Sequence, residues 1–440
     1  MENMTNKTIF ALLTVLLTLV SNFTVRAQNR TAPFDFKGRY LVSVSDADML
    51  ASAYVDGKLG FREGADALSV VPLGGDYRTW RAAETSVSNS VAGPPSSICV
   101  SPDGRWAFVI ETFGQPAATG KTFGDLPAGN RLTVINLQNP SKPVVTESIR
   151  IGNRPESVAI NPEGNLIAVT LHPPNEKPLA LVPFERGKLG QPTYHSIPSL
   201  NSDERISHAE WHPSGQFMAG TLTHSNRVIF FKVKTNKGLA IEPHGNSLYV
   251  GKYPFSAKFT PDGKHLVTNA LYWGDDVDGN YIEAPKGEIN LIRVGIEPDA
   301  SGKIKHSAIS TGKTGISPEG LTVSHDGRYV LTTNLERSYL PYDDPRITWY
   351  SSLSLFEIDK KTEQLVHLGD YSVDGILPEA AVFDASNNFI AAVDYDHFDD
   401  RKRGSAIKFW RLARDPQVKL TELEQEIPVT RGAHSMVLVK

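Results

Sequence analysis

The apolar and polar positions of this chain form short alternating runs, each about as long as a β-strand and separated by turn residues. Residues 317–334, SPEGLTVSHDGRYVLTTN, contain two such runs around His325-Asp326-Gly327. An Asp-Gly pair between two strand-like runs predicts a hairpin, because glycine adopts positive φ without steric cost. Helical periodicity is nearly absent, so the pattern predicts an all-β fold.

The same hairpin pattern occurs seven times, at intervals of roughly 50 to 65 residues, as is typical of propeller blades with loop insertions. Most copies are followed by a third apolar strand and a fourth, more polar one, as expected from the channel to the rim of a blade. The seven turns lie at residues 38–42, 102–106, 162–166, 213–217, 261–265, 325–329 and 385–389. The seventh has Asn387 in place of glycine, and asparagine also adopts left-handed backbone.

The two ends of this array predict how the ring closes. The first copy has no apolar strand before its turn, whereas residues 432–439 form an apolar run without a hairpin partner. We expect this C-terminal strand to complete the first blade as its innermost strand, which removes an exposed sheet edge. The sequence therefore predicts a seven-bladed β-propeller closed by the C-terminal strand.

A short apolar run precedes the repeats. It occupies residues 8–20, behind Lys7, and Val25 and Ala27 supply small or short residues at the −3 and −1 positions of a cleavage site after Ala27. This pattern is typical of a secretory signal peptide and is too short to span a bilayer. We predict a signal peptide at 1–27, one propeller domain at 28–440, and export to the periplasm or the extracellular space.

Charge, hydropathy and cysteine content limit the possible partners and cross-links of the chain. The formal net charge of −4 argues against a nucleic-acid surface. No later run is long and apolar enough to predict a membrane span. Cys99 is the only cysteine, so an internal disulfide is excluded, and its apolar neighbours predict a buried small side chain.

The repeats resemble those of seven-bladed propellers of the YVTN type and of the lactonase-like superfamily, whose units run Pro-x-x-apolar-x-x-x-Pro-Asp-Gly-x-x-apolar. The resemblance covers residues 38–440 and implies the propeller fold. Lactonase-like propellers use Glu, His and Arg around one channel mouth, so the resemblance also implies hydrolysis of a small oxygen-rich molecule such as a lactone. Propellers host enzymes, binders and scaffolds alike, so function has to be argued from the site.

In this architecture, residues before the inner strands and after the second strands converge on one mouth of the channel. The inner strands begin, in ring order, at Ser96, Glu156, His208, Phe255, Glu319, Glu379 and His434. A ring of polar groups favours a ligand, water or metal, because unpartnered buried polar groups are costly. The predicted catalytic residues are Glu156, His208, Glu319, Glu379 and His434. The alternative is a local role, in which Glu after Pro caps backbone amides.

The ends of the second strands, together with arginines near the mouth, supply candidate binding residues. They are Arg154, Glu111, His172, His224, Tyr272, Arg337 and His397. The two arginines are placed to hold a substrate carboxylate or a developing oxyanion, and the histidines have an alternative as solvated loop residues. Long insertions at 113–130, 272–287, 338–351 and 395–404 should rise over the same mouth and could bind a protein partner.

A divalent cation is the one cofactor that the sequence suggests. Resemblance to gluconolactonase-type propellers implies a site formed by Glu319, Asn334 and Asp394, whose ligands suit calcium or magnesium, with zinc as a further possibility. The acidic loop 275–280 suggests calcium, but it lacks the full EF-hand spacing, so a solvated loop is the alternative. The chain has no Gly-rich phosphate loop, H-E-x-x-H, G-x-S-x-G or C-x-x-C-H motif.

Two functions remain open at this point. The first is an exported hydrolase or lyase acting on a small-molecule lactone or sugar acid, in which a channel Glu or His activates water. The second is a non-catalytic binding propeller whose loops carry the function. Convergence of the five predicted catalytic residues on an open cavity favours the enzyme, whereas a mouth plugged by Phe255 and loop aromatics favours the binder.

Overall fold

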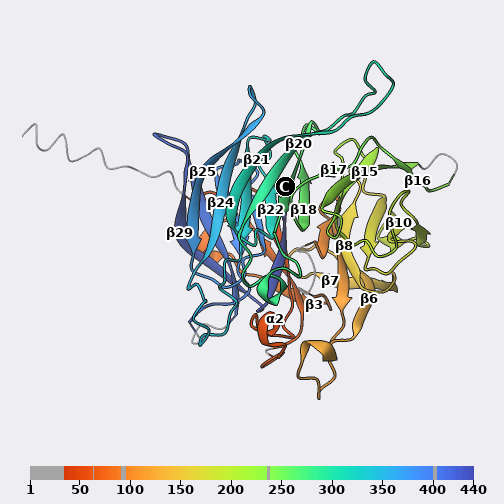
Figure 1. Ribbon diagram of the computed structural model, residues 1–440. Helices are drawn as coiled ribbons and strands as arrows, with labels where there is room; N and C mark the ends of the chain where they lie inside the picture. Colours follow the sequence, from red (N-terminus) through yellow and green to blue (C-terminus); the bar gives the residue numbers. More distant parts are fainter. Residues whose placement is uncertain (1–33, 63, 91–95, 235–237, 400–403) are drawn as a thin grey trace, which may run out of the picture. The chain divides into compact units, whose positions relative to one another are not determined.

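The unit Phe36–Lys440 consists almost entirely of antiparallel β-sheets (Figure 1). There are seven sheets among the described residues, and their inner strands line one central channel, so the fold is a seven-bladed β-propeller. The computed structural model describes residues 34–62, 64–90, 96–234, 238–399 and 404–440. The predicted leader at 1–27 lies outside these residues. Among the described residues, no helix combines the length and apolarity needed to cross a membrane.

Each blade is one sheet, and residues from all seven innermost strands line the channel. From the channel outward, blade one contains β30 (Ala433–Val439), β1 (Tyr40–Ser45), β2 (Ala67–Pro72) and β3 (Ala83–Ser86); blade two contains β4 (Ile98–Val100), β5 (Trp106–Phe113), β6 (Ala128–Asn136) and β7 (Val144–Arg150); blade three contains β8 (Pro155–Ile160), β9 (Leu166–Leu171), β10 (Leu179–Glu185), β11 (Lys188–Leu189) and β12 (Thr193–His195). Blade four contains β13 (Ile206–Trp211), β14 (Phe217–Leu222), β15 (Arg227–Lys234), β16 (Ala240–Pro243) and β17 (Leu248–Tyr249); blade five contains β18 (Pro254–Phe259), β19 (His265–Ala270), β20 (Lys286–Arg293) and β21 (Ser307–Ile316). Blade six contains β22 (Gly320–Val323), β23 (Tyr329–Asn334), β24 (Ser351–Asp359) and β25 (Gln364–Val373); blade seven contains β26 (Ala380–Phe383), β27 (Phe389–Val393), β28 (Ser405–Ala413) and β29 (Lys419–Val429).

Closure of the ring by the C-terminal strand is confirmed. Strand β30 pairs antiparallel with β1, from Tyr40 opposite Val439 to Ser45 opposite Ala433. Blade one therefore joins the two ends of the sequence in one sheet. Its inner edge is occupied by the last strand of the chain, so no blade is left incomplete at the seam.

The repeated turns have the backbone that their residues predict. The glycines of the five middle turns all have φ between 67° and 74°. Asn387, which replaces glycine in the seventh turn, has φ 59°, so the prediction of left-handed backbone there is confirmed. These turns place the start of each second strand at the same end of the ring.

The apolar core lies between neighbouring blades. Phe108 and Ile110 of blade two, for example, pack with Ile167 and Val169 of blade three. Comparable clusters join the following pairs of blades as far as blades six and seven. Burial on both faces explains why the middle strands are nearly continuous apolar runs.

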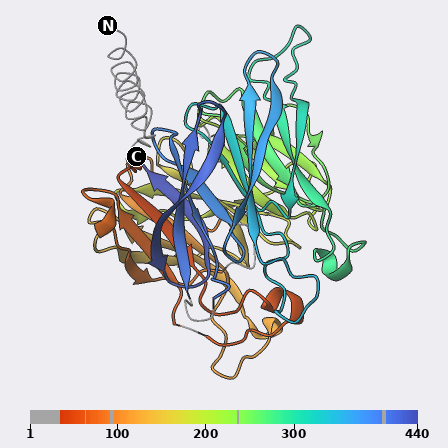
Figure 2. The same cartoon turned by 90° about the vertical axis from the view of Figure 1, so that its left-hand side faces the viewer.

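Loops from several blades gather at one end of the ring, together with the short helix α2 (Ala53–Asp56) and the 3-10 turns Phe123–Asp125 and Asp278–Asn280 (Figure 2). A further 3-10 turn spans Tyr77–Thr79. Side chains from all four predicted insertions join one hydrophobic cluster, which we call the loop cluster. It also includes Met49, Ala51 and Ala53 from a loop that the sequence did not single out. The four insertions therefore share one mouth, as predicted.

Candidate functional site

A cavity of about 190 Å³ lies at this end of the ring, and we call it the mouth cavity. The starts of inner strands line one side of it and the loop cluster lines the other. Its charged or titratable wall consists of Arg154, His172, Arg205, Glu319 and Glu379, besides three tyrosines. Four of these five residues were predicted from the sequence, and the structure brings them together.

Glu156 lies just outside the mouth cavity and contacts two of the residues that line it, Arg205 and His172. Its buried carboxylate accepts hydrogen bonds from Nε and Nη2 of Arg205, at 2.9 and 2.7 Å, and contacts Nδ1 of His172. Burial alone would raise the pKa of Glu156, but Arg205 and His172 together hold it below its usual value. Glu156 is therefore charged and orients the imidazole, whose Nε2 has no hydrogen-bond partner among the described residues.

Glu319 and Glu379 form the acidic part of the wall. Burial raises the pKa of Glu319 to about 8, although Arg205 opposes the shift. Burial and the charge of Glu319 raise the pKa of Glu379 well above its usual value. The side chain of Glu319 has no hydrogen-bond or ion-pair partner within the described chain. This pair therefore retains at least one proton near neutral pH.

Arg154 presents a half-buried cation that forms no ion pair with the described residues. It precedes β8 with φ 47°, and its guanidinium lies 4.4 Å from the centroid of the Phe113 ring. Its Nε is buried without a hydrogen-bond partner, and the described residues supply no ion pair to its side chain. Burial lowers its pKa. An unpaired guanidinium in a cavity is suited to bind an anion or an oxygen that becomes negative during a reaction.

Aromatic rings complete the wall. Seven of the lining residues are aromatic, including Tyr54 of α2 and Phe255 of β18. Trp273 packs 5.8 Å from Phe255, measured between ring centroids, and donates a hydrogen bond to the hydroxyl of Ser317. The aromatics narrow the mouth, but Phe255 lines the cavity without filling it. The site is thus a small pocket with mostly aromatic and aliphatic walls and a few charged groups.

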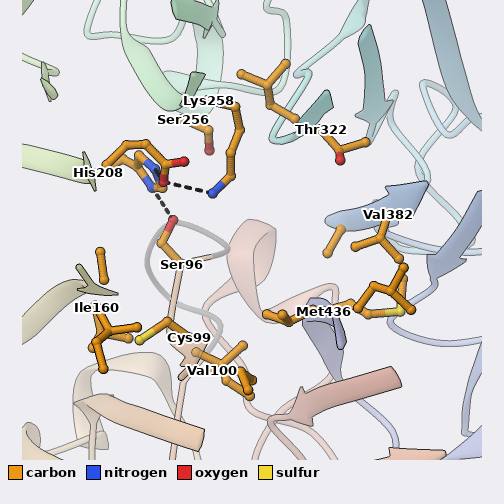
Figure 3. A pocket seen from close by; sticks show the side chains of 18 of the residues that line it. Ser96, Cys99, Val100, Ile160, His208, Ser256, Lys258, Thr322, Val382 and Met436 are labelled. Atoms are coloured by element: carbon orange, nitrogen blue, oxygen red, sulfur yellow. Dashed lines mark hydrogen bonds and ion pairs between the residues drawn. The ribbon is translucent and has the colours of Figure 1, made fainter. Parts of the chain in front are cut away.

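A second cavity, of about 370 Å³, follows the axis of the ring between the inner strands, and we call it the channel cavity (Figure 3). His208 lines this cavity, and Glu379 lines both cavities. Cys99 also lines the channel and is half-buried, so it is less enclosed than predicted. The predicted catalytic residues therefore do not share one cavity: Glu319 and Glu379 line the mouth cavity, whereas His208 and Glu379 line the channel cavity.

His434 lies outside both cavities. It is fully buried, its Nε2 lies 2.7 Å from Oδ1 of Asn89, and burial lowers its pKa to about 3. The histidine is thus neutral and ties the inner strand of blade one to its neighbouring loop. Its position in the alignment predicted a catalytic role, but its contacts are those of a core residue.

The remaining predicted binding residues also lie outside the mouth cavity. Glu111 accepts a hydrogen bond from the backbone N–H of Asn130. The ring Nδ1 of His224 lies 2.8 Å from the carbonyl oxygen of Asp203, and Lys313 lies over the ring of Tyr272. Two others have partners elsewhere. Arg337 donates to the carbonyl oxygen of Ile282, and His397 lies 3.7 Å from a carboxylate oxygen of Asp394.

The predicted metal ligands have separate partners. Only Glu319 lines the mouth cavity. The amide of Asn334 is engaged by Thr332, Ser352 and Ser354 within its own blade. Asp394 lies 2.9 Å from Nζ of Lys408. In the loop 275–280, Asp276 pairs with Lys252 and Asp278 pairs with Arg346, so lysine and arginine neutralise these two carboxylates.

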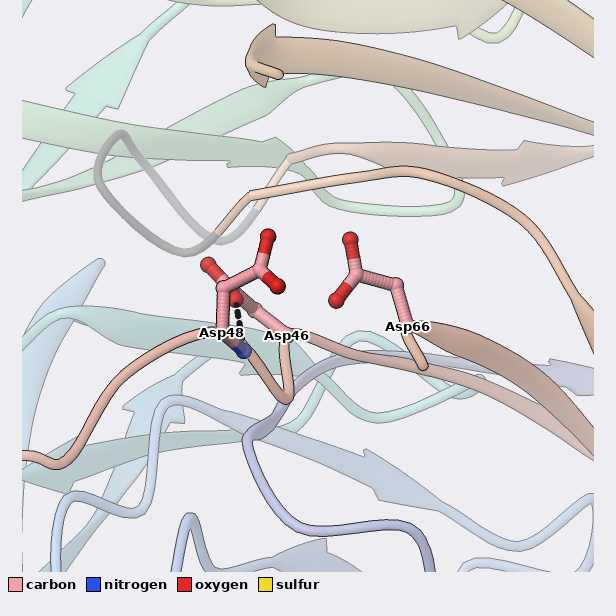
Figure 4. A group of neighbouring side chains, drawn as sticks. All are labelled: Asp46, Asp48 and Asp66. Atoms are coloured by element: carbon pink, nitrogen blue, oxygen red, sulfur yellow. Dashed lines mark hydrogen bonds between the residues drawn. The ribbon is translucent and has the colours of Figure 1, made fainter. Parts of the chain in front are cut away.

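The described residues contain one cluster of three carboxylates, formed by Asp46, Asp48 and Asp66 (Figure 4). Their oxygens lie within 4.8 Å of one another, and all three residues are buried. Burial and the neighbouring charges raise the pKa of Asp48 to about 6 and that of Asp66 to about 9. Arg62 lies 2.9 Å from Asp48. The three carboxylates have the donor atoms for a hard cation. The raised pKa values favour protonation, which lowers the repulsion between the carboxylates, and the positive charge of Arg62 lowers it further.

Arg205 and Tyr54 are two site residues with polar groups that the sequence interpretation missed. Arg205 directly precedes β13, just as Arg154 directly precedes β8, so this shared position before an inner strand could have identified Arg205 from the sequence. Tyr54 belongs to the short helix α2, within the loop segment between β1 and β2, where the sequence shows no motif. Only the packing of that loop in the loop cluster places its side chain at the cavity.

No protein-family model matches the chain, and no curated protein matches its sequence. Several solved structures share its fold. A candidate 6-phosphogluconolactonase from Bacteroides fragilis NCTC 9343 is 13% identical with a TM-score of 0.59, over 91% of this chain and 98% of that one. The periplasmic gluconolactonase PpgL from Pseudomonas aeruginosa is 16% identical with a TM-score of 0.56, over 91% and 99%. A protein from Lactobacillus plantarum is 12% identical with a TM-score of 0.58, over 92% and 100%. At these identities the likeness establishes the fold.

Proposed function

We propose that this protein is an exported hydrolase that opens a small lactone in the mouth cavity. One observation carries the proposal: a carboxylate-oriented histidine, an unpartnered carboxyl and an unpaired arginine line the same small cavity. Two similar structures are named as lactonases, which supports this reaction class. The predicted leader at 1–27 and the periplasmic location named for the Pseudomonas protein support export.

In the proposed mechanism, His172 is the general base. Glu156 holds its Nδ1, so Nε2 is free to take a proton from a water molecule. The water oxygen attacks the lactone carbonyl carbon, and Arg154 donates hydrogen bonds to the oxyanion that forms. Arg205 keeps Glu156 charged and in place.

Glu319 is the general acid. With a pKa of about 8, most of the carboxyl is protonated at neutral pH, and it can donate its proton to the ring oxygen as the carbon–oxygen bond breaks. The product is an open hydroxy acid. The cavity volume of about 190 Å³ limits the substrate to a small ring, and its aromatic wall suits the carbon face of a sugar acid.

The test is hydrolysis of glucono-1,5-lactone and of five-membered sugar-acid lactones, corrected for the spontaneous rate and run with and without chelator. We expect Glu319→Gln and His172→Gln each to lower kcat by about 100-fold or more. Activity should fall as the pH rises through about 8, where Glu319 loses its proton. Glu336→Gln is the matched control, because Glu336 is a buried glutamate that lies outside the mouth cavity.

Equal rates for wild type and Glu319→Gln on every lactone would overturn the proposal. The alternative function is a non-catalytic binding propeller, and the enclosed aromatic pocket is equally suited to it. A sugar acid or lactone that binds without turnover, with Arg154→Ala abolishing the binding, would favour that alternative.

A further inference from the structure

The channel cavity contains a second group of reactive side chains, which the proposed lactonase mechanism does not use. Ser96 and His208 are both more than nine-tenths buried, and Glu210 and Lys258 are partly exposed to the same space. Figure 3 shows the side chains of Ser96, His208 and Lys258 pointing toward one another from the channel wall. They come from the inner strands of blades two, four and five or from the residues just before them.

The distances are those of a nucleophile, a base and an orienting carboxylate. Oγ of Ser96 lies 2.6 Å from Nδ1 of His208. On the other side of the ring, Nε2 lies 3.5 Å from Oε2 of Glu210, which also lies 2.9 Å from Nζ of Lys258. Nε2 is buried and makes no hydrogen bond with the described residues. When the serine hydroxyl donates to Nδ1, the ring proton is on Nε2 and faces the carboxylate.

The charge states suit that arrangement. Burial lowers the pKa of His208, so the resting ring is neutral and able to accept a proton. Burial would raise the pKa of Glu210, but Lys258 and His208 hold it below its usual value. The carboxylate is therefore charged and can stabilise the imidazolium that forms when the serine loses its proton.

The rest of the channel wall indicates the ligand. Ile98, Val158, Leu321, Val382 and Met436, from five different blades, give the channel wall an aliphatic part. The far end of the cavity is lined by Pro102, Pro162 and His325, which belong to the turns at the opposite end of the inner strands from the mouth. The channel is thus suited to a slender acyl chain that approaches from the turn side of the ring.

We propose that Ser96 is a nucleophile, activated by His208 with Glu210 as a positioning residue, that reacts with esters of short unbranched fatty acids. Oγ bonds to the acyl carbon while its proton passes to Nδ1 of His208. The ester carbon–oxygen bond then breaks, and the alcohol leaves with that proton. Water repeats the sequence, releasing the carboxylic acid and restoring the serine.

The test uses a fluorophosphonate probe, from which the serine oxygen displaces fluoride, together with hydrolysis of p-nitrophenyl butyrate. We expect one adduct on the full-length protein, mapped to Ser96 by peptide mass spectrometry, and none on Ser96→Ala. His208→Gln should slow labelling by about 100-fold or more. Glu210→Gln should slow butyrate hydrolysis less than His208→Gln does. It should also shift the pH profile to lower pH, because the Glu210 carboxylate raises the pKa of His208 and its charge is then lost.

Ser97→Ala is the matched control, because Ser97 is the buried neighbour whose hydroxyl donates to Ser435 and does not line the channel. It should label at the wild-type rate, and so should Glu319→Gln, which separates this site from the proposed lactonase. Circular dichroism melts establish that each variant is folded. Absence of an adduct on folded wild type, or an adduct that survives in Ser96→Ala, would overturn the inference.

Discussion

Replacing Glu156 by glutamine tests the electrostatics on which the mouth cavity depends. The change removes one negative charge and leaves the size of the side chain nearly unchanged. The Glu156 side chain is fully enclosed, accepts two hydrogen bonds from Arg205 and contacts His172. After the substitution, the Arg205 guanidinium remains buried and loses its counter-ion.

Breaking a buried ion pair by removing one partner typically costs about 3–5 kcal/mol, because the other charge stays desolvated. The amide oxygen of glutamine can still accept one hydrogen bond from Arg205. We therefore expect Glu156→Gln to lower the free energy of unfolding by about 3 kcal/mol at pH 7. That is a large fraction of the roughly 5–15 kcal/mol that stabilises a typical domain.

The pH dependence follows from the direction of the pKa shift. The folded-state pKa of Glu156 lies below its usual value of 4.5, so its contribution is present above that value and is lost as the pH falls. Urea denaturation at pH 7 and at pH 4 should show the difference between wild type and Glu156→Gln shrinking at the lower pH.

A second substitution provides the internal control. Adding Arg205→Met to Glu156→Gln removes the orphaned cation and should restore part of the lost stability. If the single variant matched wild type at pH 7 to within about 0.5 kcal/mol, the range of an ordinary surface substitution, the assignment of a charged, buried Glu156 would be wrong.

Two further predictions concern the C-terminal strand β30 and the side chain of Arg154. Deleting residues 432–440 removes the inner strand of blade one, so we expect the truncated protein to lose the single cooperative transition in a thermal melt; a melt like that of the full chain would contradict the role of β30. In the lactone assay, Arg154→Ala should lower kcat by about 100-fold, and Arg154→Lys should recover part of that loss; unchanged kcat in both variants would exclude Arg154 as the oxyanion donor.

The fold could be predicted because its signals are local and repeated. A Gly or Asn in left-handed backbone marks six of the seven blades, as Gly104 and Asn387 illustrate. The closing strand was identifiable for a related reason, because one unpaired apolar run at the end of the array matched one missing strand at its beginning. Neither inference needed knowledge of side-chain contacts between distant segments.

The site was harder to predict because sequence register does not fix side-chain direction at the starts of the inner strands. The pairing of β8 with β9 shifts between Pro155 and Ser157, and that of β13 with β14 shifts between Ile206 and His208. An irregularity of one residue changes the direction of a side chain. In both strands the irregularity falls on the second residue, so the structural counterpart of Glu156 is Ser207, and the sequence alignment with His208 was off by one residue. Glu156 therefore lies behind the mouth cavity, whereas His208 lies in the channel.

Joining the first and last strands in one blade has a consequence for biosynthesis. The N-terminal part of the chain emerges from the ribosome long before β30 is synthesised, and β30 is the strand that pairs with β1 on its channel side. Blade one therefore lacks its inner strand throughout translation, and the finished ring forms only after the last residues have emerged. Every prematurely terminated product keeps an open, adhesive sheet edge, which is a feature that chaperones and proteases can recognise.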